Sequence, residues 1–144
     1  MVLAYSILTV VTFFLHFTWE TAHIRLYKNY DALKGSASWR IPVPVWAALG
    51  DVAYTLFAIL LIALLKGNLA WFETSTAGDY IGFAVLGFIT ALFVEYKAFY
   101  FKRWEYTEKM PIIPVLRVGL SSVIQKTLLF PLSVWFTVLL AHLI

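Results

Sequence analysis

Four stretches of the sequence are long and apolar enough to cross a lipid bilayer. A helix needs about 20 residues to span a hydrocarbon core of ~30 Å, and apolar runs of this length occupy 2–24, 44–66, 79–101 and 119–143. Of the 144 residues, 62% are hydrophobic and 13% are charged, whereas soluble domains carry about 25% charged residues. We therefore predict an all-α, polytopic membrane protein, with residues 1–144 forming a single domain, a four-helix transmembrane bundle.

Proline and glycine residues predict local features of this bundle at a few positions. Pro111 and Pro114 lie in the stretch 107–119, which we expect to be an interfacial or re-entrant segment. Pro131 should kink the fourth helix, because proline has no N–H for the helical ladder. Gly82 and Gly87 in the third helix are typical of positions where two helices pack closely.

Basic residues are concentrated in two of the three predicted loops. The loop between the second and third spans instead has Lys66 at its edge, followed by the acids Glu73 and Asp79. By the positive-inside rule, the basic loops face the cytoplasm and both termini face outside. Such loops attract anionic headgroups, so we expect membrane lipids as partners and no nucleic acid. The basic residues of the two loops are Arg25, Lys28, Lys34 and Arg40, and Lys102, Arg103, Lys109 and Arg117.

Polar and ionisable residues inside the spans fall mainly toward the predicted cytoplasmic side. A charged side chain at the bilayer centre costs roughly 2.5–3.5 kcal/mol, so such residues usually face the bundle interior and pair there. Snorkelling toward the interface accounts for His23 and Lys97, but the side chains of Glu20 and Asp51 are too short for it. We predict a polar pocket between the helices. Its catalytic candidates are His16, Glu20, Asp51 and Glu95, and its substrate-binding candidates are Trp19, His23, Tyr54, Gln125 and Lys126.

His16, Glu20 and His23 follow the spacing i, i+4, i+7, which places them on one helix face. This stripe suits a metal bound by two imidazoles and a carboxylate, a histidine–glutamate pair that passes a proton, or a polar headgroup. The other histidine, His142, lies at the opposite side of the membrane, so we predict no metal and no other cofactor. We favour proton handling by His16 and Glu20, and a purely structural helix–helix contact remains the alternative.

The partner of Lys126 decides which carboxylate can act as an acid. If Lys126 pairs with Asp51 or Glu95, Glu20 can keep its proton and serve as the acid. The aromatic faces of Trp19 and Tyr54 attract cations, which suits either a protonated amine ligand or a carbocation intermediate.

The stretch FLHFTWETAHIRLY (14–27) resembles a transmembrane segment of the emopamil-binding, sterol-isomerase type of the EXPERA superfamily. In that segment a histidine, here His16, and a glutamate four residues later, here Glu20, are followed by a tyrosine-containing end, here Tyr27. ALGDVAYT (48–55) is similar to the acidic start of the next family helix, and LLFPLSVWF (128–136) to its last, proline-containing helix. The resemblance implies a four-helix core and proton-driven chemistry on isoprenoid- or sterol-like double bonds.

Two classes of function remain open. The first is a protein that binds, isomerises or cyclises a lipidic, isoprenoid- or sterol-like small molecule by acid/base chemistry. The alternative is a small proton-coupled transporter or channel that works as a homo-oligomer, with Glu20 and Asp51 as its protonation sites. Transporter sites tend to lie near the bilayer midplane, so the skew of the polar residues toward one side favours the first class. An accessory subunit is a third reading.

Overall fold

The computed structural model describes residues 1–28 and 42–143, so Lys34 and Arg40 of the first basic loop lie outside the described residues. It contains four long helices, each long and apolar enough to cross a membrane. This confirms the predicted four-helix transmembrane bundle, and every predicted helix end lies within two residues of the observed one. The helices are α1 (Val2–His23), α2 (Val43–Lys66), α3 (Ala77–Tyr100) and α4 (Leu120–Ala141), and the short elements are η1 (Ile24–Leu26), η4 (Trp71–Thr74), β1 (Ile112–Ile113) and β2 (Val118–Gly119).

The connection from α2 to α3 is fixed by local interactions at both helix ends. α2 is capped at its C-terminal end by Gly67, whose φ of 64° is a left-handed conformation that glycine adopts without strain. α3 begins with a capping box in which the Thr76 N–H donates to Asp79 Oδ2 at 2.9 Å. Lys66 Nζ lies 2.5 Å from Asp79 Oδ1. The end of α2 is therefore held against the start of α3.

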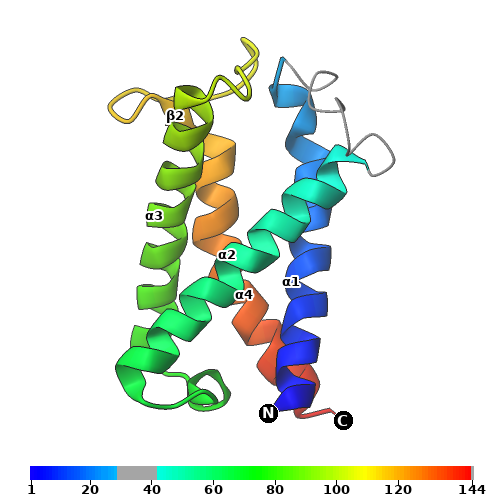
Figure 1. The fold of residues 1–144 in the computed structure, drawn as a ribbon, viewed down its shortest axis with the longest axis vertical. Helices are drawn as coiled ribbons and strands as arrows, with labels where there is room; N and C mark the ends of the chain where they lie inside the picture. The colour runs from blue at the N-terminus through cyan, green and yellow to red at the C-terminus, as the bar shows by residue number, and fades with distance from the viewer. Residues whose placement is uncertain (29–41, 144) are drawn as a thin grey trace.

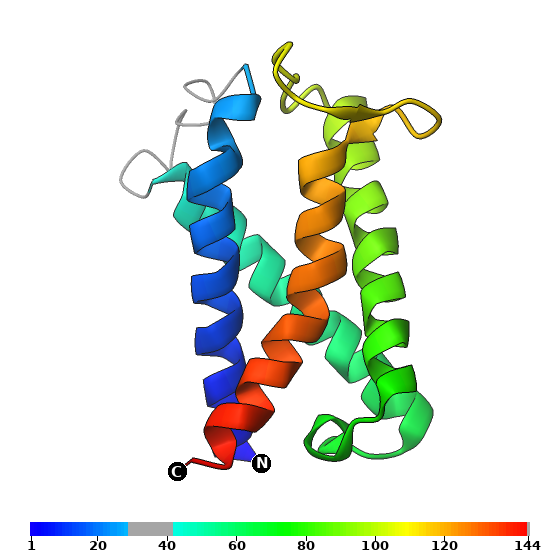
Figure 2. The same ribbon diagram turned by 180° about the vertical axis from the view of Figure 1, so that it is seen from behind.

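From this connection α2 and α3 diverge. Figure 1 shows α2 running diagonally from the start of α3 toward the far end of α1. α4 packs along α3 and α1, and α1 packs along α2, whereas α2 contacts α3 much less. Figure 2, seen from behind, shows the first half of α4 beside α3 and its last half beside α1. The walls formed by α2 and α3 are thus separated at one end of the bundle.

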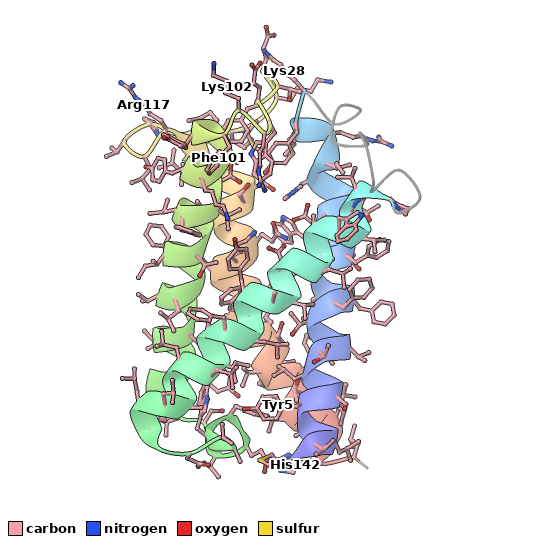
Figure 3. All side chains as sticks on the ribbon, viewed as in Figure 1. Tyr5, Lys28, Phe101, Lys102, Arg117 and His142 are labelled. Atoms are coloured by element: carbon pink, nitrogen blue, oxygen red, sulfur yellow. The ribbon has the colours of Figure 1, made fainter. Side chains whose placement is uncertain are left out.

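The two ends of the bundle differ in character. Both termini lie at one end, which we call the terminal end, together with the labelled Tyr5 and His142 (Figure 3). Lys28, Lys102 and Arg117 project from the other end, which we call the basic end (Figure 3). This grouping agrees with the predicted clustering of basic loops, and the side of the membrane on which they lie stays a prediction.

The terminal half of the bundle is filled by a tightly packed apolar core. The ring of Phe83 packs against Trp71 at 6.0 Å and against Phe130 at 5.3 Å between ring centroids. The indole N–H of Trp71 donates to the carbonyl of Ile59 at 3.1 Å, so the polar atom of this ring is satisfied. Leu8 from α1 completes the cluster and is fully buried. This core draws on all four helices and on η4.

The segment 107–119 lies across the basic end and forms a small hairpin (Figure 1). β1 and β2 pair antiparallel, with Ile112 opposite Gly119. The backbone N–H of Thr107 donates to the carbonyl of Leu26 at 2.8 Å, which ties this segment to η1. The segment therefore covers the basic end of the bundle, and its position relative to the membrane, interfacial or re-entrant, stays a prediction.

The helix-breaking and helix-packing predictions have mixed outcomes. α4 continues through Pro131 and bends along its length (Figure 2). A Cβ added at Gly87 would collide with the backbone carbonyl of Lys126 and stand 3.2 Å from the ring of Phe130, so Gly87 is a close-packing position as predicted. Gly82 has open space where a Cβ would stand, so the same prediction is wrong there.

The contrast between the two glycines gives a test of the α3–α4 contact. We expect Gly87→Ala to lower the free energy of unfolding by about 1–3 kcal/mol, because the added methyl forces the helices apart. Gly82→Ala should leave stability unchanged or raise it by up to about 1 kcal/mol, since alanine favours helix. Denaturant unfolding in detergent micelles measures both, and equal stability of the two variants would contradict the close α3–α4 packing.

Candidate functional site

A cavity of about 360 Å³ lies in the basic half of the bundle, where α2 and α3 diverge. All four helices contribute to its lining, as does the segment that follows α3. The volume falls in the range of roughly 300–1,000 Å³ that is usual for small-molecule sites. Its polar lining is Glu20, Asp51, Glu95, Ser122, Gln125 and Lys126, its aromatic lining is Tyr27, Trp46, Tyr54 and Trp104, and two further cations, Lys97 and Arg103, also line it.

The helical period explains why the polar side chains converge. The buried residues of α1 recur about every four positions, from Leu8 through His16 and Glu20, and form one inward stripe. On α4, Ser122, Gln125 and Lys126 share a buried face in the same way. Lipid offers no hydrogen-bond partners, so these stripes turn inward, where the polar groups can satisfy one another.

The side-chain amide of Gln125 joins the polar groups of three helices. Its Nε2 lies 2.8 Å from Glu20 Oε1 and 2.9 Å from Asp51 Oδ2. His16 Nδ1 lies 3.0 Å from the same oxygen of Asp51. An amide nitrogen has two hydrogens, which the two carboxylates accept, while Nδ1 of His16 donates to Asp51. The opposite ring nitrogen, Nε2 of His16, is buried and has no partner within the described chain.

Asp51 also forms a buried ion pair with Lys126. Lys126 Nζ lies 2.9 Å from Asp51 Oδ1, and the two residues are only 4% and 5% exposed. Each oxygen of Asp51 therefore has its own donors, with Lys126 on one and His16 and Gln125 on the other. Full hydrogen bonding of this kind is what allows a charge pair to persist in an apolar interior.

Glu20 has a different set of partners. Its Oε2 lies 3.2 Å from His23 Nε2, and Nδ1 of His23 lies 3.1 Å from the hydroxyl of Ser121. Glu20 thus pairs with His23, whereas His16 pairs with Asp51, and Gln125 links the two pairs. The predicted exchange between His16 and Glu20 would have to pass through this amide. Lys126 pairs with Asp51, one of the two carboxylates predicted as its partner.

Glu95 is held by donors from outside the helices. The hydroxyl of Tyr106 donates to Glu95 Oε2 at 2.5 Å, the indole N–H of Trp104 donates to the same oxygen at 3.2 Å, and the hydroxyl of Tyr27 donates to Oε1 at 3.3 Å. Burial, and next the charge of Glu95, raise the pKa of both phenols, Tyr27 and Tyr106, above the ordinary value of 10.0. Both therefore remain protonated donors at neutral pH.

The structure brings together most, though not all, of the predicted site residues. His16 and His23 lie behind the pocket wall and reach it through Asp51 and Glu20. Trp19 does not line the cavity, and its buried indole N–H has no partner within the described chain. The predicted residues that do line the cavity are Glu20, Asp51, Tyr54, Glu95, Gln125 and Lys126.

Several contributors to the site were not among the predicted residues, among them Ser122, Trp104 and Tyr106, which bond to its polar groups. Ser122 lies one helical turn before Gln125 and accepts or donates a 2.6 Å hydrogen bond with the hydroxyl of Tyr27, so helical spacing from Gln125 could have identified it. Trp104 and Tyr106 lie beyond the third span, and no pattern within the spans points to them. The sequence feature that could have identified these two residues is the density of aromatic residues in KRWEY (102–106), directly after the helix that carries Glu95.

Within residues 1–28 and 42–143, no group of three or more histidine or acidic side chains is arranged to hold a metal ion. No protein-family model, no curated protein and no solved structure matches this chain. The resemblance to the EXPERA superfamily therefore stays an expectation.

Removing the cation of the buried ion pair tests its role in stability. Lys126→Met leaves the carboxylate of Asp51 buried without its cation, and breaking such a pair costs about 3–5 kcal/mol. The double variant Asp51→Asn/Lys126→Met should recover much of this loss, because no uncompensated charge remains. Unfolding free energies in detergent measure both effects, and wild-type stability of Lys126→Met would show that the pair does not hold the bundle.

An alkaline titration tests the environment of Glu95. The tyrosinate absorbance lost in Tyr106→Phe should correspond to a phenol that ionises well above pH 10.0, because burial and Glu95 both disfavour its anion. The folded-state pKa is the raised one, so the stabilisation from this phenol is complete below pH 10.0 and is lost as pH rises toward the folded-state value. A midpoint near pH 10.0 for this residue would contradict its contact with Glu95.

Proposed function

We propose that this protein binds a lipidic small molecule in the pocket and isomerises or cyclises an isoprenoid- or sterol-like double bond by acid/base chemistry. The observation that carries the proposal is the convergence of Glu20, Asp51 and Glu95, from three helices, on one cavity lined by aromatic rings. This cavity lies between α2 and α3 where they diverge, so an apolar ligand would enter from the bilayer. With the basic loops in the cytoplasm, it would enter from the cytoplasmic leaflet.

Glu20 is the proposed acid. Its carboxyl O–H bond breaks as the proton forms a C–H bond with one alkene carbon, which leaves a carbocation at the other. A neighbouring carbon then loses a proton to the carboxylate of Glu95 or Asp51, and those C–H electrons form the new double bond. The substrate gains one proton and loses one, so an isomerisation is balanced without a cofactor. Positioned acids and bases of this kind contribute typically 10²–10⁴-fold to rate.

The surroundings of Glu20 support this role. The contact with His23, and from His23 to Ser121, gives a short path by which a proton can return to Glu20 from the basic end. The rings of Trp46 and Tyr54 line the cavity, and aromatic faces stabilise a cation by about 0.5–2 kcal/mol. The apolar core of the terminal half closes the pocket from the other side.

The same apolar core makes the alternative, a proton-coupled transporter, less well supported. Phe83 and Phe130 are buried between the pocket and the terminal end, and Trp71 packs on Phe83. A path for protons through one chain would have to cross these rings. Transport through a homo-oligomer would instead need a path between chains.

Solvent deuterium provides a direct test. The protein in nanodiscs is incubated in D₂O with a panel of isoprenoid and sterol alkenes, and deuterium incorporated at carbon is measured by mass spectrometry. We expect incorporation into at least one member of the panel, and Glu20→Gln should reduce it by about 10²-fold or more, because the amide cannot donate the proton that the carboxyl supplies.

The matched control is Glu108→Gln, which removes an exposed carboxylate at the same end of the bundle. It should leave deuterium incorporation unchanged. Wild-type incorporation by Glu20→Gln would remove Glu20 from the mechanism, and a complete absence of incorporation across the panel would argue against the proposed chemistry.

A further inference from the structure

We infer that the ligand is a phosphorylated isoprenoid amphiphile, whose anionic head lies on Lys97 and Arg103 at the pocket mouth and whose tail points inward toward Glu20. This inference rests on the proposed function and names the substrate class of the same site. The juxtaposition that carries it is a cavity lined by two cations, the exposed Arg103 and the half-buried Lys97, and by three buried carboxyl groups, those of Glu20, Asp51 and Glu95.

Lys97 marks the edge of the cavity between α2 and α3. Its Nζ lies 5.7 Å from the centre of the Phe93 ring, one turn earlier on α3. The ring of Phe93 in turn meets the ring of Tyr54 on α2, with centroids 6.5 Å apart. Tyr54 and Lys97 both line the cavity. The ammonium group therefore lies beside a contact between the two diverging helices.

Arg103 supplies the second cation from the segment that follows α3. It lines the same cavity next to Trp104, whose indole N–H is bonded to Glu95. Its guanidinium lies 5.9 Å from the ring of Phe101 and its side chain is exposed. A guanidinium offers planar pairs of donors that match phosphate oxygens. Lys97 and Arg103 thus add an ammonium and a guanidinium to the lining of one cavity.

The inner surface of the pocket cannot hold an anionic head. The carboxylates of Asp51 and Glu95 face it, and Lys126, its inner ammonium group, is already paired with Asp51 at 2.9 Å. A phosphate placed there would be repelled, whereas at the mouth it meets unlike charge. The depth agrees with this placement, because Lys97 lies in the last turn of a candidate membrane span, where lipid phosphates also lie. The cavity of about 360 Å³ fits a short prenyl tail.

The test compares three ligands that share one tail. The protein is placed in nanodiscs of phosphatidylcholine and titrated with farnesyl diphosphate, farnesyl phosphate and farnesol, with tryptophan fluorescence as the readout, since Trp46 and Trp104 line the cavity. We expect the diphosphate to bind about 10-fold or more tightly than farnesol, as charge-assisted hydrogen bonds add affinity. In Lys97→Gln/Arg103→Gln this preference should disappear, while farnesol binding stays unchanged.

The matched control is Lys102→Gln/Lys109→Gln, which removes the same charge from the same end of the bundle at positions that do not line the cavity. It should keep the preference for diphosphate. Loss of the preference in this control would assign the effect to general surface charge and overturn the inference. Retention of the preference in Lys97→Gln/Arg103→Gln would overturn it as well.

Two competition arms identify the source of the phosphate. If inorganic diphosphate binds as tightly as farnesyl diphosphate, the site at the mouth binds a free anion. That result would overturn the claim that the prenyl tail contributes to binding. Phosphatidylglycerol nanodiscs that abolish the preference would assign the two cations to bilayer headgroups and also overturn it. Weak competition in both arms is the expected result.

Failure of this inference is distinguishable from failure of the proposed function. Equal binding of farnesol and farnesyl diphosphate would overturn the phosphate assignment and leave the acid/base proposal standing. If none of the three ligands binds and no alkene takes up deuterium, the proposed function itself fails.

Discussion

The side chains of Gln125 and Lys126 on α4 and Asp51 on α2 form a buried polar connection inside the candidate membrane spans, which Gln125 extends to α1, and the rest of the structure depends on this connection. A polar group in hydrocarbon is costly unless another protein group satisfies it. Gln125 and Lys126 from α4 bind Asp51 from α2, and Gln125 also binds Glu20 from α1. The same contacts that hold the helices together also fix the position of the acid.

The second constraint is the geometry of the α2–α3 connection. Lys66 and Asp79 hold the two helices together at the terminal end, and the diagonal course of α2 carries them apart toward the basic end (Figure 1). α3 packs closely on α4 at Gly87, so the helix that lies apart from α3 at the basic end is α2. A pocket is therefore present in the half of the bundle that carries the polar groups, while the other half is filled by aromatic rings.

The helices and the positions of the polar residues along them could be predicted from the sequence, because span length and hydropathy depend on local composition. Which polar side chains pair with one another could not be predicted. His16 and Glu20 share a face of α1, yet each turns to a different partner, because Asp51 arrives from α2 and His23 lies one turn along α1. Helical spacing alone defines a face and does not say which neighbouring helix meets it. Trp19 is the neighbour of Glu20 in the sequence, but adjacent helical positions lie about 100° apart. Of these two residues only Glu20 therefore faces the cavity.

Glu95 has hydrogen-bond donors that sequence patterns within the spans do not predict. Its three donors, Tyr27, Trp104 and Tyr106, all come from outside the long helices. They are brought to it by the backbone contacts that tie the segment after α3 to the end of η1. Contacts of this kind join residues far apart in the chain and leave no periodic signal.

Native mass spectrometry of the protein, extracted gently from its membrane, tests most directly whether the pocket holds a lipidic molecule. Gly50 lines the cavity and a Cβ there meets open space, so Gly50→Phe should fill the pocket without disturbing the fold, and Gly82→Phe is the matched control on an open face. We expect a discrete adduct of isoprenoid or sterol mass on the wild type and on Gly82→Phe, and its loss in Gly50→Phe. A ligand-free oligomer, or an adduct that Gly50→Phe retains, would contradict the account.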